Sequence, residues 1–294
     1  IGGSRASMAL LAAEVLGVPV ETIRPAVVDT DSVGYCDVTG GSRTTLATGG
    51  AVIKAAEALV NELRKRAAAL LSVAIEEVEW IDGSAVVRGG VGIEALHDRA
   101  SAGAEKEAAE PGGRVVTLAE IAAKAGSTGG PLCAVASHNA HNAAPSFAVN
   151  ICDVQVDRET GKVDILRYPC IQDAGKAVHP AYVEGQMQGG AVQGIGWALN
   201  EEYLYNEQGV LENPGFLDYR IPVASDLPMI DTVIVEVPNP LHPYGIRGVG
   251  EVPIIPPMPA VVTAVNQAAG ITVCDLPLSP SRVLAAIDAG AGGG

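Results

Sequence analysis

The chain has 294 residues, of which 48% are hydrophobic, and its formal net charge at pH 7 is −15. This length suffices for one large domain or two ordinary ones, with a core built mainly from Ala, Val, Ile and Leu, because Phe and Trp number two each. The negative charge argues against binding to nucleic acid or to anionic membrane surfaces and is typical of a soluble surface. No uninterrupted apolar stretch reaches the ~20 residues of a membrane-spanning helix.

The cysteines are widely separated and form no C-x-x-C pair. This spacing argues against zinc and iron–sulfur sites and against a disulfide framework. Buried free thiols in a reducing compartment are the simplest interpretation, and we therefore expect a cytoplasmic protein. The chain begins at Ile1 with sequence typical of the middle of a domain and with no signal peptide, so we expect it to be one piece of a larger polypeptide or assembly. The five cysteines are Cys36, Cys133, Cys152, Cys170 and Cys274.

The first part of the chain predicts two helices and a connecting strand. Apolar residues repeat at helical spacing over residues 3–16, and Gly17 and Pro19 end the pattern. A short buried strand is expected over residues 23–28, and a polar loop follows. A long apolar stripe predicts a second helix over residues 48–71.

The junction between that loop and the second helix carries a signal for anion binding. The segment Thr39-Gly-Gly-Ser-Arg-Thr-Thr45 would present backbone N–H groups at a helix start, beside hydroxyl and guanidinium groups. It is not a P-loop, because no G-K-[ST] ends it. A capped helix N-terminus accounts for the same residues equally well, so phosphate binding and capping both stay open.

The middle of the chain predicts a hairpin, a connection and a pair of strands. Residues 78–88 turn at Asp82-Gly83 and predict a β-hairpin, and residues 89–115 are typical of a surface excursion or an interdomain connection. A short helix over residues 118–124 is expected to begin with a capping box. Two strands over 146–157 and 162–173 should pair antiparallel.

Two histidines, His138 and His141, lie three residues apart between these elements. That spacing can ligate a metal ion on a helix, but no third ligand or helical pattern lies nearby. A polar surface loop is the better interpretation, and no metal ligand from the protein is expected there.

Residues 180–199 predict a helix that contains five glycines. Each glycine costs about 1 kcal/mol relative to Ala in a helix, so the bare backbone must serve a purpose. Close helix packing and close approach of a bulky cofactor both explain it. Among the glutamine side chains, Gln193 is the preferred candidate for a cofactor contact.

The last third of the chain predicts strands over 217–222 and 232–237 and helices over 259–269 and 281–287. Between them, Pro243-Tyr-Gly-Ile-Arg-Gly-Val-Gly-Glu-Val-Pro253 packs three glycines next to Glu251. Such density of glycine indicates tight backbone geometry or close approach to a ligand. A surface turn before a helix, with Glu251 near the helix dipole, explains the pattern equally well.

These elements predict an α+β fold with two lobes of mixed, largely antiparallel sheet and packed helices. We expect a first lobe over residues 1–115 that contains the Ser42 loop, and a second over residues 116–294 that contains the Glu251 turn.

Four blocks together resemble the molybdenum hydroxylase family, which includes xanthine dehydrogenase, aldehyde oxidoreductase and nicotinate dehydrogenase. Each block is short and rich in glycine, and their order and spacing make the combination specific. The resemblance is to the C-terminal half of the molybdopterin-binding subunit and spans almost the whole chain. The blocks are Ile1-Gly-Gly-Ser-Arg5, Thr39-Gly-Gly-Ser-Arg-Thr-Thr45, residues 184–196 with Glu201-Glu202, and Gly248-Val-Gly-Glu251.

The resemblance implies that Glu251 is the catalytic base, standing beside molybdenum and taking a proton from a metal-bound hydroxyl. The resulting oxygen would attack an electron-poor carbon of an N-heterocycle or aldehyde while hydride passes to a sulfido ligand, so that water is the source of the oxygen. The pterin dithiolene would hold the metal, which explains why no protein side chain is needed as a direct ligand.

The resemblance also implies the contacts of a molybdenum–molybdopterin cofactor. Analogy with bacterial split subunits suggests that the pterin carries a cytosine dinucleotide. The loop would hold the phosphates, Gln193 would contact the pterin, and the opening glycines and the Glu251 turn would line the same site. The cofactor-binding residues expected in this way are Gly2, Gly3, Gly40, Gly41, Ser42, Arg43, Thr44, Gln193, Gly248, Val249 and Gly250.

The chain departs from the family at its opening block, where G-Q-G is usual and Gly2-Gly-Ser-Arg5 stands instead. That glutamine contact is therefore lost, or supplied by Ser4 or Arg5. An iron–sulfur subunit, an FAD-containing flavin subunit and the N-terminal half of the molybdopterin subunit are expected as partners, with a small-molecule substrate. We expect the chain alone to be inactive.

Two other interpretations remain. A non-catalytic scaffold subunit of the same fold is favoured by the lost glutamine and opposed by the intact Gly-Val-Gly-Glu251. A metal-independent hydrolase using Glu251 and a histidine lacks support, because neither G-x-S-x-G nor H-E-x-x-H occurs.

Overall fold

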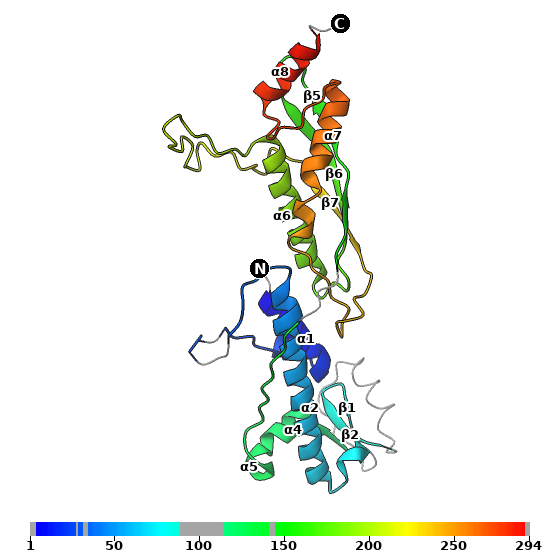
Figure 1. The fold of residues 1–294 in the computed structure, drawn as a ribbon. Coiled ribbons are helices and arrows are strands. Elements are labelled where there is room, and N and C mark those ends of the chain that lie inside the picture. Colours follow the sequence, from blue (N-terminus) through cyan, green and yellow to red (C-terminus); the bar gives the residue numbers. More distant parts are fainter. Residues whose placement is uncertain (1–3, 28, 32–34, 89–113, 141–144, 292–294) are drawn as a thin grey trace. The chain divides into compact units, whose positions relative to one another are not determined.

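The computed structural model describes residues 4–27, 29–31, 35–88, 114–140 and 145–291, and the elements are drawn in Figure 1. The chain divides into two compact units. The larger unit contains residues 1–2, 37–46 and 141–294, and the smaller unit contains residues 3–36 and 47–140. These units are defined by how compactly the residues pack, and their boundaries differ from those of the two lobes expected at 1–115 and 116–294. The two lobes stay a prediction.

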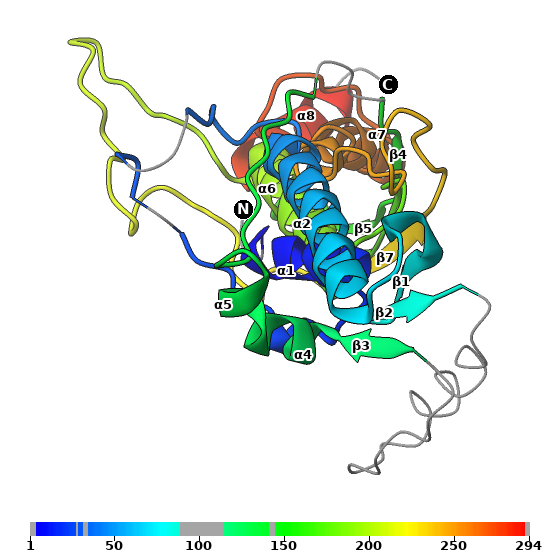
Figure 2. The same ribbon diagram turned by 90° about the horizontal axis from the view of Figure 1, so that it is seen from below.

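The smaller unit packs two long helices beside a three-stranded sheet. Its core joins Leu16, Leu63, Ala67, Val78 and Ile121, and the antiparallel sheet has the order β1-β2-β3 (Figure 2). Its elements are α1 (Ser4–Leu16), α2 (Gly49–Leu71), β1 (Val78–Ile81), β2 (Ser84–Val87), β3 (Val115–Thr117), α4 (Leu118–Ala123) and α5 (Ala125–Thr128), with 3-10 turns at Val20–Thr22 and Ile75–Glu77.

The local signals of this unit mostly predict its structure correctly. Both long helices form, and the hairpin turns at Asp82 and Gly83, which adopt φ of 44° and 71°. The expected capping box is present, because Glu120 N donates to Thr117 Oγ1 while Thr117 N donates to Glu120 Oε2. The strand expected over residues 23–28 is wrong for its described part, which is irregular and mostly exposed. Pro25 cannot donate a ladder hydrogen bond, which explains the failure.

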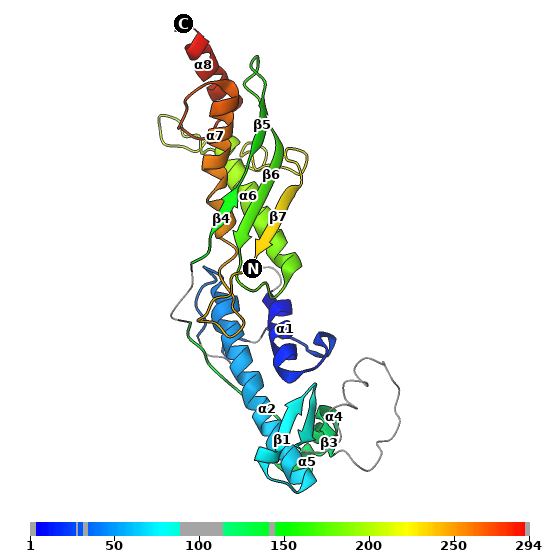
Figure 3. The ribbon, with the colours of Figure 1, turned by 90° about the vertical axis from the view of Figure 1, so that its right-hand side faces the viewer.

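The larger unit is a four-stranded sheet with α6 and α7 packed beside it (Figure 3). The long strand β6 pairs antiparallel with β4 and β5 and parallel with β7. Tyr168 and Cys170 of β6 join Met187 of α6 and Val261 and Val265 of α7 in one buried core. The elements are β4 (Ala148–Asn150), β5 (Asp153–Val156), β6 (Val163–Asp173), α6 (Pro180–Leu199), β7 (Ile230–Val235), the 3-10 turn η4 (Val252–Ile254), α7 (Pro257–Ala269) and α8 (Pro280–Ala291).

The expected antiparallel pair is confirmed, although its first strand is broken into β4 and β5 at Ile151 and Cys152. The helices expected after the Glu251 turn also form, as α7 and α8. The strand expected over residues 217–222 is wrong, because these residues form turns and lie mostly exposed. Among the described residues, no strand pairs with the backbone of this segment. Within the described residues, we find no helix with the length and apolar character needed to cross a bilayer.

The cysteines differ in exposure, so the expectation of buried thiols holds only in part. Cys36, Cys133 and Cys274 are exposed, Cys152 is half-buried and Cys170 is fully buried. Burial raises the pKa of the Cys152 thiol to about 12 and that of the Cys170 thiol to about 11.

A thiol reagent at pH 8 should therefore spare Cys152 and Cys170 in the folded protein and modify both after denaturation, since the thiolate is the reactive form. Mass spectrometry of peptides modified before and after unfolding measures this difference. The exposed Cys274 is the internal control and should react in the native state. Rapid native-state modification of Cys170 would contradict the assigned burial.

Candidate functional site

The Glu251 turn meets the Ser42 loop within the larger unit. The N–H of Gly41 donates a hydrogen bond to Glu251 Oε2, although the two residues are 210 positions apart in the chain. The N–H of Val249 donates to Ser42 Oγ at 2.9 Å. Two of the glycine-rich segments singled out from the sequence thus lie against each other.

The two segments are in ordinary van der Waals contact here, and a left-handed φ favours glycine at position 41. A Cβ on Gly248 would lie 3.5 Å from the carbonyl oxygen of Gly41, at the near limit of ordinary contact. Gly41 and Ser42 adopt φ of 55° and 58°, in the left-handed region. This conformation is uncommon for serine, and such backbone strain is concentrated at functional sites. The loop is therefore shaped to present Gly41 N–H and Ser42 Oγ to the Glu251 turn.

The remaining polar groups of the loop are partly engaged with one another. Arg43 Nη1 lies 3.1 Å from Asp37 Oδ2, and the Thr39 and Thr44 hydroxyls are 2.8 Å apart. The side chains of Arg43 and Asp37 are 42% and 39% exposed. A Cβ on Gly40 would meet nothing within 4 Å. Open space beside a cationic side chain can accommodate an anionic group.

The loop does not end in an ordinary capped helix. Residues Thr44–Thr48 form a π-helical turn, and the side chain of Thr48, the N-cap of α2, makes no capping hydrogen bond. π-helical turns frequently occur at functional sites. The capping explanation for the loop therefore loses support, while phosphate binding by Gly40, Arg43 and Thr44 stays a prediction.

Helix α6 lies against the other side of the Glu251 turn. A Cβ on Gly190 would fall 2.5 Å from Pro253 Cγ, and one on Gly194 would fall 2.7 Å from the carbonyl oxygen of Ile254. Close packing thus explains these two glycines. Gly185 and Gly189 differ, because a Cβ at either position would meet nothing within 4 Å.

One glutamine of α6, Gln186, lies beside the same turn. Gln186 Nε2 lies 2.9 Å from where a Cβ on Gly250 would be. Gln193 is exposed and follows Gln186 by seven residues, about two helical turns, so it projects from the same face. Its expected role as a cofactor contact stays a prediction. Gly2 and Gly3, also expected at the cofactor, lie outside the described residues.

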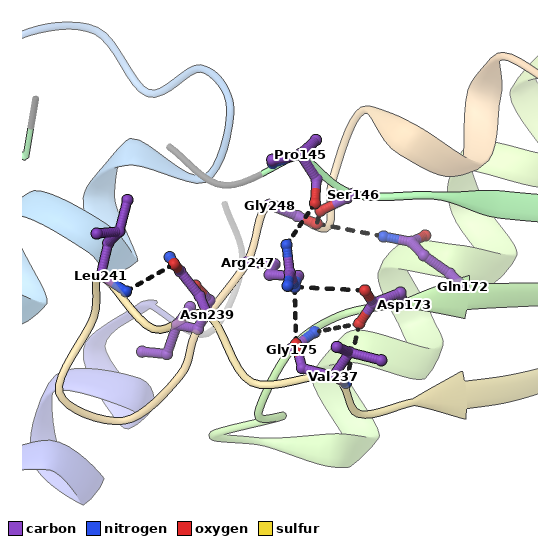
Figure 4. Close-up of polar contacts among 11 residues, drawn as sticks. Pro145, Ser146, Gln172, Asp173, Gly175, Val237, Asn239, Leu241, Arg247 and Gly248 are labelled. Carbon is purple, nitrogen blue, oxygen red and sulfur yellow. Dashed lines mark hydrogen bonds and ion pairs between the residues drawn. The ribbon is translucent and has the colours of Figure 1, made fainter. Parts of the chain in front are cut away.

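Four residues around the turn were missed from the sequence (Figure 4). Ser146 Oγ donates to the carbonyl oxygen of Gly248 at 2.7 Å, as Figure 4 shows. The buried Gln172 amide donates to the carbonyl of Val249 at 3.2 Å. Arg247 forms an ion pair with Asp173 at 3.3 Å. The available signal was Gln172, an amide at an inward position of β6 that otherwise holds Tyr168 and Cys170.

Among the described residues, no group of three or more His, Cys, Asp or Glu side chains is arranged to hold a metal ion. His141 lies outside those residues, so the His138–His141 pair is not described.

Comparison with known proteins identifies the family. Residues 1–228 match the sequence profile of the molybdopterin cofactor-binding domain. The chain belongs to this molybdopterin-binding family. The resemblance to xanthine dehydrogenase-like proteins seen in the sequence is thereby confirmed.

Relatives within the family are subunits of larger enzymes. The chain is 33% identical over 275 residues to a putative xanthine dehydrogenase molybdenum-binding subunit of Escherichia coli K12, covering 93% of this chain and 34% of that protein. It is 32% identical over 290 residues to the gamma subunit of the 6-hydroxypseudooxynicotine dehydrogenase complex of Paenarthrobacter nicotinovorans, covering 96% and 34%. The chain thus spans about a third of the length of these relatives.

Solved structures share the fold of this chain. CO dehydrogenase from Oligotropha carboxidovorans matches with a TM-score of 0.83 at 26% identity, over 99% of this chain and 34% of that one. Quinoline 2-oxidoreductase from Pseudomonas putida 86 matches with a TM-score of 0.79 at 28% identity, over 97% and 35%. The expected fold class, α+β with mixed and largely antiparallel sheet, is confirmed.

Substitutions at neighbouring glycines of α6 should have opposite effects. Gly190→Ala should destabilise the protein by about 1–3 kcal/mol, because the new methyl group overlaps the rigid ring of Pro253. Gly189→Ala, the matched control, should stabilise it by up to about 1 kcal/mol, because the methyl group meets open space. Urea unfolding measures both effects. Equal effects of the two substitutions would contradict the packing of α6 against the turn.

Proposed function

We propose that this chain is the molybdopterin-binding part of a molybdenum hydroxylase. The enzyme would hydroxylate an electron-poor carbon of an N-heterocycle or aldehyde with oxygen from water. The observation that carries the proposal is the contact between the Glu251 carboxylate and the Gly41 loop, in a chain of the molybdopterin-binding family. The family supplies the cofactor class, and the contact supplies a carboxylate beside the loop expected to hold it.

The residues present fit an anionic pterin cofactor. The loop offers a guanidinium at Arg43, hydroxyls at Thr39 and Thr44, and unfilled space beside Gly40. These are the donor types that hold phosphate oxygens. The amides of Gln186 and Gln193 would contact the ring system, together with the backbone of residues 248–250. When bound, the cofactor supplies a Lewis-acidic, redox-active metal centre.

Glu251 would act as the general base through one oxygen of its carboxylate. Oε2 accepts the hydrogen bond from Gly41, whereas no donor within the described part of the chain lies on Oε1. Oε1 is therefore the atom that can receive a proton. The hydrogen bond to Oε2 fixes the plane of the carboxylate, so that Oε1 keeps a defined position from which to accept a proton.

The partners and substrate follow from the family by analogy. Several relatives are named as a large chain, a large subunit or one subunit of a complex. We infer that electrons leave through iron–sulfur and flavin-containing partner chains in the cytoplasm, and that the remaining part of the molybdopterin subunit supplies the rest of the site. A cytosine dinucleotide form of the pterin belongs to the same proposal. Turnover by the isolated 294-residue chain with an artificial acceptor would refute this dependence on partners.

A scaffold subunit with a degenerate cofactor site is the second candidate, favoured by the Gly2-Gly-Ser-Arg5 opening in place of G-Q-G. Molybdenum analysis of the purified assembly separates the two functions, since the scaffold requires no metal.

In the assembled enzyme, Glu251→Gln should retain molybdenum and lose about 10²–10⁴-fold in kcat, the usual contribution of a general base. The glutamine oxygen can still accept from Gly41, so the loop contact is preserved. Metal analysis and steady-state kinetics measure the two effects. Glu207→Gln, at an exposed turn, is the control and should behave as wild type. Unchanged turnover of Glu251→Gln would remove the assigned role.

A further inference from the structure

We propose that Gln172, Asp173 and Arg247 are positioning residues for Glu251. They lie at the end of β6 and at the start of the Glu251 turn, and their hydrogen bonds fix the backbone of residues 247–249 (Figure 4). The catalytic consequence rests on the proposed function of Glu251. The structural consequence, a rigid turn, does not.

Gln172 holds two successive carbonyl groups of the turn. Its side chain is fully buried, and Nε2 lies 3.4 Å from the oxygen of Gly248 and 3.2 Å from that of Val249. Within the described residues its Oε1 has no hydrogen-bond partner. The unsatisfied oxygen carries a desolvation cost, which the hydrogen bonds from Nε2 to the turn offset. The amide is therefore matched to the two carbonyl groups of the turn.

One peptide unit of the turn is held from both sides. In a trans peptide the C=O and N–H groups point in opposite directions. The carbonyl of Gly248 accepts from Ser146 Oγ and Gln172, so the N–H of Val249 must point the other way, where it donates to Ser42 Oγ. Rotation of this peptide would break hydrogen bonds on both edges. Its orientation thus couples the sheet to the Ser42 loop.

Arg247 ties the start of the turn to two other backbone segments. Its Nε donates to the carbonyl of Val237 and its Nη1 to that of Pro145, both at 2.7 Å. Its backbone N–H donates to the carbonyl of Ala174 at 3.2 Å. Lysine could not make the two side-chain contacts together, because it has one ammonium group in place of a planar fork.

Asp173 completes the network from the sheet. Oδ2 pairs with Arg247, while Oδ1 accepts from the backbone N–H groups of Gly175 at 2.9 Å and Val237 at 3.1 Å. The two charged side chains are 11% and 12% exposed, so solvent screens the pair weakly. The carboxylate thereby fixes the same residue, Val237 after the end of β7, that the guanidinium contacts.

The network sets the position of Glu251 because only two residues, Val249 and Gly250, separate Gly248 from it. Small rotations of a peptide early in a turn displace the side chains that follow. A carboxylate misplaced by about 1 Å can cost about 10²-fold in rate. The side chains that fix the backbone of 247–249 therefore determine whether Glu251 stays against Gly41.

The test compares two variants with two matched controls in the assembled enzyme. Gln172→Leu and Arg247→Lys remove contacts to the turn. Asn150→Leu removes an amide on the same inward face of the sheet, one that donates to Tyr168 Oη and not to the turn. Arg158→Lys alters an arginine that donates to the carbonyl of Ala269, also away from the turn.

Hydrogen exchange of peptides covering residues 247–251 and 39–43 is the readout that does not depend on activity. We expect about tenfold faster exchange in both peptides for Gln172→Leu and Arg247→Lys, and wild-type exchange there for the controls. We also expect kcat to fall at least about tenfold with KM and molybdenum content unchanged. Ser146→Ala, which removes a single hydroxyl, is the milder variant should Gln172→Leu not fold, and should raise exchange in the same peptides.

Unchanged exchange in both peptides, or the same change in variants and controls, would overturn the proposal. The outcome is separable from that of the proposed function. If exchange rises as expected while Glu251→Gln remains fully active, the network holds the turn as inferred and the assignment of Glu251 as base fails.

Discussion

The candidate site of the larger unit depends on one joint, where the backbone of the Glu251 turn meets the Ser42 loop. Two hydrogen bonds cross it, one from Gly41 N–H to the carboxylate and one from Val249 N–H to Ser42 Oγ. Neither segment has regular secondary structure that could hold it alone. Each is shaped by the other and by the elements behind it. The cofactor site proposed at these loops would be only as well ordered as this joint.

Strand β6 is the element that supports the joint. It is the longest strand, pairs with three others, and ends at Asp173, where the polar network begins. On the opposite side, the glycine surface of α6 admits Pro253 and Ile254 at distances that no side chain would allow. The turn is thus confined between a polar sheet end and a bare helix surface. Within the part of the chain that the structure describes, neither donates a hydrogen bond to the Glu251 carboxylate.

Local signals in the sequence predict most of the elements, because they reside in neighbouring residues. The capping box at Thr117, the hairpin at Asp82-Gly83 and the periodicity of α2 are of this kind. The strand expected over 217–222 failed because apolar composition does not supply a pairing partner. Tertiary context decides such segments.

The sequence predicts the two segments of the candidate site, and it does not predict the residues whose hydrogen bonds hold them in place. Dense glycine and a single carboxylate identified the Glu251 turn, and the resemblance linked it to the Ser42 loop. Gln172, Asp173 and Arg247 carry no comparable local pattern, since their partners are mostly backbone groups far away in the sequence. The two purposes proposed for the α6 glycines also separate only in three dimensions, with packing at Gly190 and open space at Gly189.

The path of the chain between the two units has a consequence for any attempt to dissect this protein. Residues 37–46 belong to the larger unit, yet both flanking segments belong to the smaller one. Expression of residues 141–294 alone would therefore supply Glu251 and its sheet without the strip of backbone that receives the carboxylate. No single cut separates the units cleanly. Grafting the site onto another scaffold would require two discontinuous inserts, one with residues 37–46 and one from residues 141–294. Recombination between relatives should be tolerated best where these two segments are exchanged together.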